Sequence, residues 1–358
     1  MKINVCACVA AFTIAGSAAR ADGPPTDAAE TVRKGLEWLA RQQDRTDGHF
    51  AANTGQYPTS MTSLAGLCFL QEGSTLREGR YSPQIRKAVE WFLKRSQPNG
   101  LLGNPNNPTE ANHYMHGHGY ALLFLSCVYG EEEDEKRRAD LEKLLMKAVE
   151  FSGLAQTSMG GWGYVSAKEN GDWDEGSVTI TQVQALRAAR NAGIVVPKSI
   201  IDKAVKYLAD CTNDDGGVRY EYRRAGPSSP ALTAAALACG FSAGDYSSPL
   251  AKKWISYLLR TVPGGQKGMH RHDEYTNYYL AQAVYVLGDD RYGQMFPGTP
   301  PTAGLRWSAF RQHLFPYLRS TQAADGSWQG SHVGPVFGTT TALTILQLEN
   351  NTLPIYQR

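Results

Sequence analysis

The sequence predicts an all-α fold, an α/α toroid in which six helical hairpins form two concentric layers. Three observations predict it. Six times, an aromatic residue on an amphipathic stretch is followed by a tight glycine turn, at intervals of roughly fifty to sixty residues, a period typical of repeat architectures. The stretches before the turns carry apolar residues on one helical face, and the stretches after the turns are apolar on nearly all sides.

The turns divide each repeat into two helices. The six aromatic residues are Trp38, Trp91, Phe151, Tyr207, Tyr257 and Tyr317, and the matching glycines are Gly48, Gly100, Gly160, Gly216, Gly265 and Gly326. In the last turn, QAADGSW, Asp325 can cap the following backbone NH groups and Gly326 can adopt a positive φ. We therefore expect conformational roles for most of the turn residues.

The first helix of each hairpin is expected in the outer layer. Apolar residues at spacings of three and four lie on one helical face, as in Val32, Leu36 and Leu39 of the first repeat and Ile201, Val205 and Leu208 of the fourth. The second helices read SMTSLAGLCFL, GYALLFLSCV, SVTITQVQALRAA, PALTAAALACG, TNYYLAQAVYVLG and GTTTALTILQL. A helix without a broad polar face is buried on most sides, so these segments form the inner layer.

The chain is expected to be exported. Residues 1–21 have a lysine, an apolar run and small residues at Ala19 and Ala21, the pattern of a signal peptide cleaved after Ala21. Residues 22–358 would then form a single toroid domain, periplasmic or secreted, and no later run is long and apolar enough for a transmembrane segment. Cleavage removes Lys2 and Arg20, which equalises basic and acidic residues and disfavours nucleic acid as a partner.

Four cysteines remain after this cleavage. Cys68, Cys127, Cys211 and Cys239 match no zinc-ligand spacing, and each lies within or at the end of an apolar helical pattern. We expect small buried side chains rather than disulfide partners.

The turns carry a family resemblance. Gln156, Gly160 and Trp162 repeat the spacing of Gln322, Gly326 and Trp328. This pattern resembles the QW repeat of squalene and oxidosqualene cyclases, whose toroid fold is shared by protein prenyltransferase β-subunits and complement-like thioester domains. The resemblance implies a terpenoid cyclase or prenyltransferase-like protein, but one fold hosts unrelated sites.

A rim cavity is expected where the inner helices begin. The positive ends of the helix dipoles would meet there and favour an anionic group, and inner-helix aromatics would supply apolar walls. The aromatic candidates are Tyr120, Tyr275, Tyr278, Tyr279 and Phe337.

Carboxylates precede the third inner helix in GDWDEGSVTIT. The run of Asp172, Asp174 and Glu175 partly resembles the DxDD acid motif of class II terpene cyclases. That resemblance implies Asp174 as the catalytic acid, with Asp172 and Glu175 as its neighbours. Trp173, in the same run, is a candidate for substrate contact. The alternative is a helix cap, the commoner role of carboxylates at this position.

Histidines mark two further rim segments. HYMHGHGY holds His113, His116 and His118, MHRHDEY holds His270, His272 and Asp273, and His332 occupies a comparable position in the last hairpin. Residues at i, i+3 and i+5 do not share one helical face, so we assign these groups to substrate contact and assign no metal. The cysteine ligand of zinc prenyltransferases is missing, and the cofactor stays unknown.

Arginines supply the last candidate site. Arg223 and Arg224 in GVRYEYRRAGPSSP, with nearby tyrosines, could hold a carboxylate, a uronic acid or a phosphate, or could pair with Glu221 in solvent. Three functions therefore stay open: a cyclase-like enzyme acting on an isoprenoid, a non-catalytic binding or scaffold protein, and a polysaccharide-active α/α barrel. The expected ligand is a small molecule or a glycan.

Overall fold

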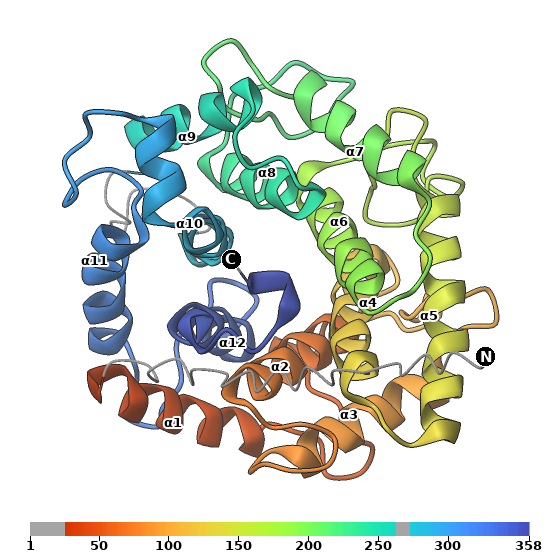
Figure 1. Ribbon diagram of the computed structural model, residues 1–358. Helices are drawn as coiled ribbons and strands as arrows, with labels where there is room; N and C mark the ends of the chain where they lie inside the picture. Colours follow the sequence, from red (N-terminus) through yellow and green to blue (C-terminus); the bar gives the residue numbers. More distant parts are fainter. Residues whose placement is uncertain (1–25, 263–272, 358) are drawn as a thin grey trace, which may run out of the picture.

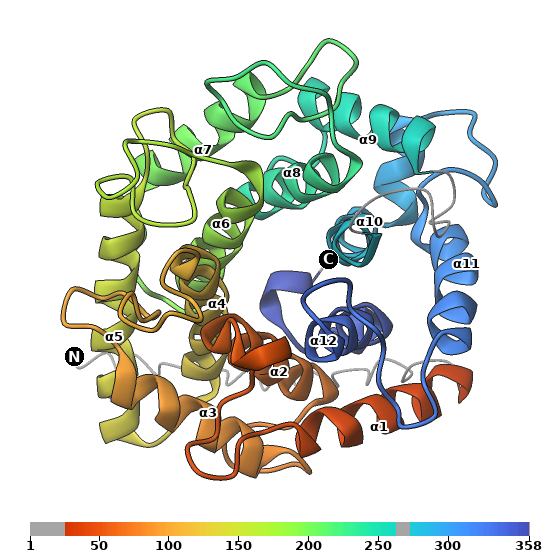
Figure 2. The same cartoon turned by 180° about the vertical axis from the view of Figure 1, so that it is seen from behind.

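The computed structural model describes residues 26–262 and 273–357, and these residues form twelve α-helices arranged as a ring. Odd-numbered helices lie outside and even-numbered helices inside (Figure 1), and the view from behind shows the same two layers (Figure 2). The outer helices are α1 (Thr26–Arg41), α3 (Ser82–Arg95), α5 (Glu135–Ala155), α7 (Lys198–Asp210), α9 (Pro249–Thr261) and α11 (Trp307–Ser320). The inner helices are α2 (Pro58–Glu72), α4 (Tyr114–Glu131), α6 (Gly176–Asn191), α8 (Pro230–Ala243), α10 (Asp273–Met295) and α12 (Pro335–Leu346). The predicted all-α toroid is confirmed.

Burial separates the two layers as the sequence predicts. Every residue of inner helix α2 except Glu72 is buried, whereas outer helix α3 buries only one face, including Ile85, Val89 and Phe92. The core therefore lies between the layers and between neighbouring inner helices, where apolar burial supplies most of the folding free energy.

The glycine turns lock each hairpin to the next outer helix. All five turn glycines within the described residues have positive φ, from 86° at Gly216 to 100° at Gly160, while Gly265 lies outside those residues. A Cβ at any of the five would approach the backbone carbonyl oxygen of a lysine on the next outer helix, 2.3 Å away for Gly160 and Lys203. The last such contact, Gly326 against Lys34 of α1, closes the ring. Glycine is required there by both conformation and space.

Glutamine amides cross-link the same junctions. Gln156 Nε2 donates to the carbonyl oxygen of Gly160 in its own turn and to that of Ile200 in α7, both at 2.9 Å. Gln322 Nε2 makes the equivalent pair of bonds to Gly326 and to Thr31 of α1. The Gln-Gly-Trp pattern is thus a structural link that repeats around the ring.

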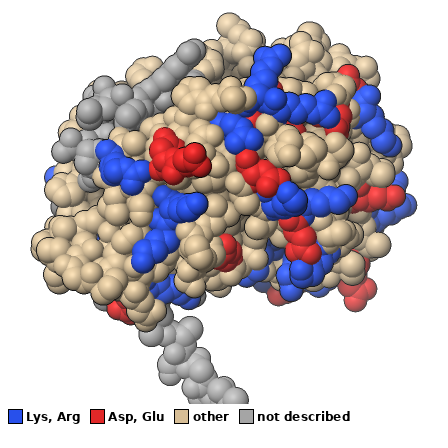
Figure 3. Space-filling view, turned by 90° about the horizontal axis from the view of Figure 1, so that it is seen from above, with Lys and Arg blue, Asp and Glu red and all other residues tan. Residues whose placement is uncertain are grey.

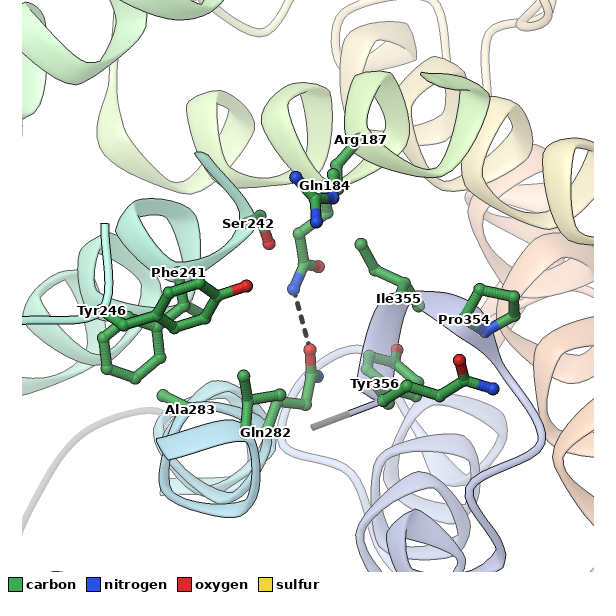
Figure 4. Close-up of a pocket in the computed structure, with 13 residues that line it drawn as sticks. Gln184, Arg187, Phe241, Ser242, Tyr246, Gln282, Ala283, Pro354, Ile355 and Tyr356 are labelled. Atoms are coloured by element: carbon green, nitrogen blue, oxygen red, sulfur yellow. Dashed lines mark hydrogen bonds between the residues drawn. The ribbon is translucent and has the colours of Figure 1, made fainter. Parts of the chain in front are cut away.

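The C-terminal segment packs at one end of the ring. A 3-10 turn, η4 (Pro354–Tyr356), packs on α6 and α10, and the Tyr356 side chain is buried. A small cavity of about 40 Å³ lies beside this turn. Figure 4 shows its lining side chains, among which Gln184 Nε2 donates to Gln282 Oε1 at 2.9 Å. Such a volume suits one or a few waters rather than an organic ligand.

The sequence also predicts unpaired, buried cysteines and, after cleavage of residues 1–21, equal numbers of basic and acidic residues. Cys68, Cys127, Cys211 and Cys239 are all free, and only Cys127 is partly exposed. On the face shown in Figure 3, basic and acidic side chains are interspersed. Among the described residues, no helix combines the length and apolarity needed to cross a bilayer.

Candidate active site in the central cavity

A cavity of about 520 Å³ lies at the opposite end of the ring from the C-terminal turn, where the inner helices begin. Each inner helix contributes at least one residue from its first turn: Ser60, His116, Ser177, Ala231, Tyr275 and Phe337. The volume falls within the range of about 300–1,000 Å³ that small-molecule sites occupy. The expected rim cavity is therefore present.

Glu175 is the buried carboxyl group of this cavity. Its side chain has no solvent exposure and caps α6, where Oε2 accepts from the Ser177 backbone NH and Oε1 from that of Val178, both at 2.8 Å. Burial is the largest effect and raises the pKa of Glu175 to about 7, although these hydrogen bonds lower it. A protonated carboxylic acid is thus accessible near neutral pH.

Ser177 and His116 connect this acid to the cavity. The Ser177 hydroxyl donates to Glu175 Oε1, and His116 Nε2 lies 2.9 Å from Ser177 Oγ and 3.8 Å from Glu175 Oε1. Burial, reinforced by His113, lowers the pKa of His116 to about 3, so its imidazole is neutral at neutral pH. A neutral imidazole can accept or donate a proton through the serine hydroxyl.

The other residues of the carboxylate run do not line the cavity. Asp174 accepts from the Tyr222 backbone NH at 3.1 Å, and Asp172 forms an ion pair with Arg223 at 2.7 Å. Trp173 Nε1 donates to a carboxylate oxygen of Glu221. The expectation that Asp174 faces the ligand is corrected, because its side chain points to the neighbouring loop. Trp173 likewise lies behind the cavity wall.

The histidine triplet is divided by the helix, as the spacing predicts. His113 and His116 line the cavity, and the His113 ring contacts Tyr57 and Tyr164. His118 lies on the far side, where Nδ1 accepts from the Leu102 backbone NH at 3.2 Å, so it is not a substrate contact.

The arginines also lie away from the wall. Arg223 pairs with Asp172, and Arg224 lies 3.4 Å from Glu221. Neither borders the cavity, so the expected clamp for a carboxylate or a uronic acid is corrected to loop ion pairs.

Of the predicted wall tyrosines, Tyr120 and Tyr275 line the cavity. The Tyr120 hydroxyl lies 3.0 Å from that of Tyr279, and the Tyr275 ring packs edge-on against the Tyr279 ring at a centroid distance of 4.8 Å. Tyr278 belongs to the core instead, with its hydroxyl 3.5 Å from that of Tyr356.

The remaining predicted residues come from the fifth and sixth hairpins. His332 lines the cavity beside Ser331, whereas His270 and His272 lie outside the described residues. Asp273 is the first residue of α10, and its side chain is not among those that the structure describes.

Charge around the cavity differs from the expectation of an anion site. Glu175 and Glu274 are acidic, and no Lys or Arg occurs among the described residues of the wall. At two inner helices the dipole end is met by a carboxylate of the protein itself, since Glu175 caps α6 and buried Glu110 accepts from the Thr59 backbone NH at 3.3 Å in α2. The described part of the cavity therefore suits an uncharged ligand.

Sequence reasoning did not assign a site role to several cavity residues, chiefly Ser177, Tyr164 and Glu274. Ser177 had a readable signal, because it follows Glu175 at the start of a helix. Glu274 also had a signal, because it follows Asp273 in the rim segment MHRHDEY, whereas the position of Tyr164 depends on the path of a loop.

Comparison with known proteins places this geometry in a wider class. No protein-family model matches the sequence. A segment of 144 residues is 25% identical to drimenyl diphosphate synthase from Streptomyces showdoensis, covering 40% of this chain and 24% of that enzyme. The match thus spans about a quarter of that relative.

Solved structures match almost the whole ring. The type II terpene cyclase MstE from Scytonema matches with a TM-score of 0.58 at 15% identity, over 92% of this chain and 99% of that one. The unsaturated glucuronyl hydrolase of Bacillus sp. GL1 gives 0.62 at 16%, over 92% and 98%. An α-1,6-mannanase of Salegentibacter sp. HEL1_6 gives 0.62 at 9%, over 90% and 99%. The chain has a terpene cyclase-like α/α toroid fold, which terpene cyclases share with glycoside hydrolases.

Proposed function

We propose that the central cavity binds an uncharged isoprenoid and that Glu175 protonates one of its double bonds to start a cyclisation. The observation that carries this proposal is a fully buried carboxyl group at the wall of an aromatic-lined cavity. Protonating an alkene requires a carboxylic acid kept in its neutral form, and burial favours that form. The partial similarity to drimenyl diphosphate synthase supports an isoprenoid. The name of that enzyme includes a diphosphate, and we infer an uncharged ligand instead because the described wall carries no Lys or Arg.

Residues of this chain can both donate the proton that starts the reaction and accept the proton that ends it. Glu175 gives a proton to one alkene carbon, and the other carbon becomes a cation that the next double bond attacks. The faces of Tyr120, Tyr275 and Phe337 can stabilise that positive charge. Neutral His116 then takes a proton from a carbon beside the final cation, which forms a new double bond. The Ser177 hydroxyl links His116 to Glu175 and offers a path for returning that proton.

The test is incubation of the protein with neutral prenols and prenylated phenols in D2O, followed by mass spectrometry. We expect a cyclised product that is one mass unit heavier than the substrate when Glu175 exchanges with D2O between turnovers. The product has the same mass as the substrate when Ser177 returns the removed proton to Glu175. Glu175→Gln should lower the rate at least about a hundredfold, the usual loss for a general acid. Failure of all substrates to bind, or full activity of Glu175→Gln, would overturn the proposal.

Glycan hydrolysis is the second candidate, and the presence of two carboxyl side chains at the cavity, Glu175 and Glu274, favours it. Glycosidases generally need both an acid and a second carboxylate. Glu274→Gln therefore separates the two functions, because it should abolish glycan cleavage and leave Glu175-dependent cyclisation. Glycan cleavage would be measured by the release of reducing sugar, and cyclisation by the mass of the product.

A non-catalytic role would use the same cavity without proton transfer. Under that alternative, Glu175 serves only as the cap of α6, and prenols would bind without conversion. Export through residues 1–21 remains a prediction, since they lie outside the described residues.

A further inference from the structure

Two loops beside the cavity are joined residue by residue. Residues 172–174 precede α6, and residues 221–223 precede α8. We call these six residues the clasp. Its contacts are the Asp172–Arg223 ion pair, the Trp173 indole bond to Glu221, and the Tyr222 backbone NH bond to Asp174.

Burial makes this clasp a fixed part of the wall. Asp174 is 2% exposed and Glu221 8% exposed, so bonds from the partner loop take the place of water at both carboxylates. The Gly176 backbone NH also donates to the Tyr220 carbonyl oxygen at 3.1 Å, directly beside the clasp. These bonds fix the position of Tyr220 relative to the start of α6.

Tyr220 meets Tyr164 at the cavity. Their hydroxyl groups are hydrogen-bonded, and both rings pack on Trp173, with centroid distances of 5.1 Å for Tyr164 and 6.2 Å for Tyr220. Both tyrosines line the cavity, yet Tyr220 is 45% exposed, which places its ring at the mouth. Two linked rings from different loops therefore bridge this side of the opening.

We propose that the Tyr164–Tyr220 pair, held by the clasp, sets the width of the ligand that can enter the cavity. The site would admit slender acyclic chains such as prenols, or such chains with a single ring, and reject wide polycyclic molecules. This inference rests on the proposed function for the class of natural substrate. Under it, Asp172 and Asp174 position the tyrosine pair and do not transfer protons.

The experiment measures a ratio of affinities. Neutral prenols of increasing length and two apolar fluorescent dyes, one narrow and one polycyclic, are titrated into the full chain. Tyr220→Ala should raise the affinity of the wide dye relative to the narrow dye about tenfold, which corresponds to about 1.4 kcal/mol. Tyr220→Phe keeps the ring and should change the ratio less. Tyr246→Ala, a matched tyrosine at the small cavity of Figure 4, should keep the wild-type ratio.

The outcomes separate this inference from the proposed function. If dyes bind but no prenol does, the isoprenoid proposal fails, while the dye ratio still decides the width limit. If the wild-type chain binds no probe and Tyr220→Ala binds one, the width limit is supported. An unchanged ratio in Tyr220→Ala, or no binding to either protein, overturns it.

Hydrogen exchange tests the clasp without any ligand. Trp173→Phe removes the indole donor to Glu221, so we expect faster exchange at the Tyr222 and Gly176 NH groups and a raised wide-to-narrow ratio. Unchanged exchange together with an unchanged ratio would show that the clasp does not position the tyrosine pair.

Discussion

Asp174 and Glu175 are adjacent, yet only Glu175 borders the cavity. Glu175 has extended backbone angles, φ −156° and ψ 157°, and successive side chains of extended backbone point to opposite sides. Asp174 therefore faces the loop before α8 while Glu175 faces the ligand space. The sequence could predict a carboxylate beside the start of this helix, but not which one, because that choice depends on the direction of a short loop.

A pH prediction follows for Glu175. Its folded-state pKa, about 7, is above the ordinary value of 4.5, so the folded chain holds a proton that the unfolded chain releases. The free energy of unfolding should therefore fall as pH rises between those values, by at most about 1.4 kcal/mol per pH unit. Chemical denaturation from pH 5 to 8 would show a smaller decrease in Glu175→Gln. An identical pH profile in both proteins would contradict the raised pKa.

The cyclisation rate should also depend on the protonation of Glu175 and should fall as the pH rises. Protonation requires the neutral acid, so the cyclisation rate should decrease above about pH 7. Initial rates of product formation across this range provide the measurement. A rate that rises from pH 7 to 9 would exclude Glu175 as the proton donor.

At the scale of elements, the helices followed from the sequence far better than the loops. Apolar spacing and glycine turns predicted which helices are inner and outer, because burial repeats with the helical period. The lysine carbonyls that meet the turn glycines were not predicted, since they come from the next hairpin. For the same reason, the contacts of Trp173 and Arg223 with the neighbouring loops had no signal in local sequence.

A pair of glycine substitutions isolates the cost of this packing. Gly160 and Gly193 have similar φ values, 100° and 92°, but a Cβ at Gly193 would meet nothing within 4 Å. Gly193→Ala should cost about 1–2 kcal/mol from backbone conformation alone. Gly160→Ala should cost more, because its Cβ would also lie 2.3 Å from Lys203 O. Equal losses in urea denaturation would show that the turn tolerates the contact.

At the scale of the whole molecule, one end of the ring holds the candidate binding site and the other end holds the C-terminal turn. The inner helices begin at the cavity at one end, and the C-terminal turn packs on α6 and α10 at the other. The sequence predicted a ring and a rim site, but the C-terminal turn is short and lies outside the repeat pattern. Its role depends on the buried Tyr356 side chain, which repeat analysis does not address.

Removing the Tyr356 side chain should lower the stability of the protein without changing its affinity for prenols. Tyr356→Ala should destabilise the protein by about 3 kcal/mol, the usual cost of truncating a buried aromatic. Tyr356→Phe is the matched control and should cost much less. The folded fraction of Tyr356→Ala should keep wild-type prenol affinity, because the cavity lies at the other end. Loss of binding with little loss of stability would contradict this division.

The central claim is that an uncharged isoprenoid occupies the space where the inner helices begin. A neutral prenol carrying a diazirine can be crosslinked to the protein by light, and the labelled peptides identified by mass spectrometry. We predict labels on cavity residues such as Met61, Tyr164 and Phe337, with excess unlabelled prenol competing for them. Labels confined to the outer helices or to the C-terminal end, or labels that prenol does not displace, would contradict the claim.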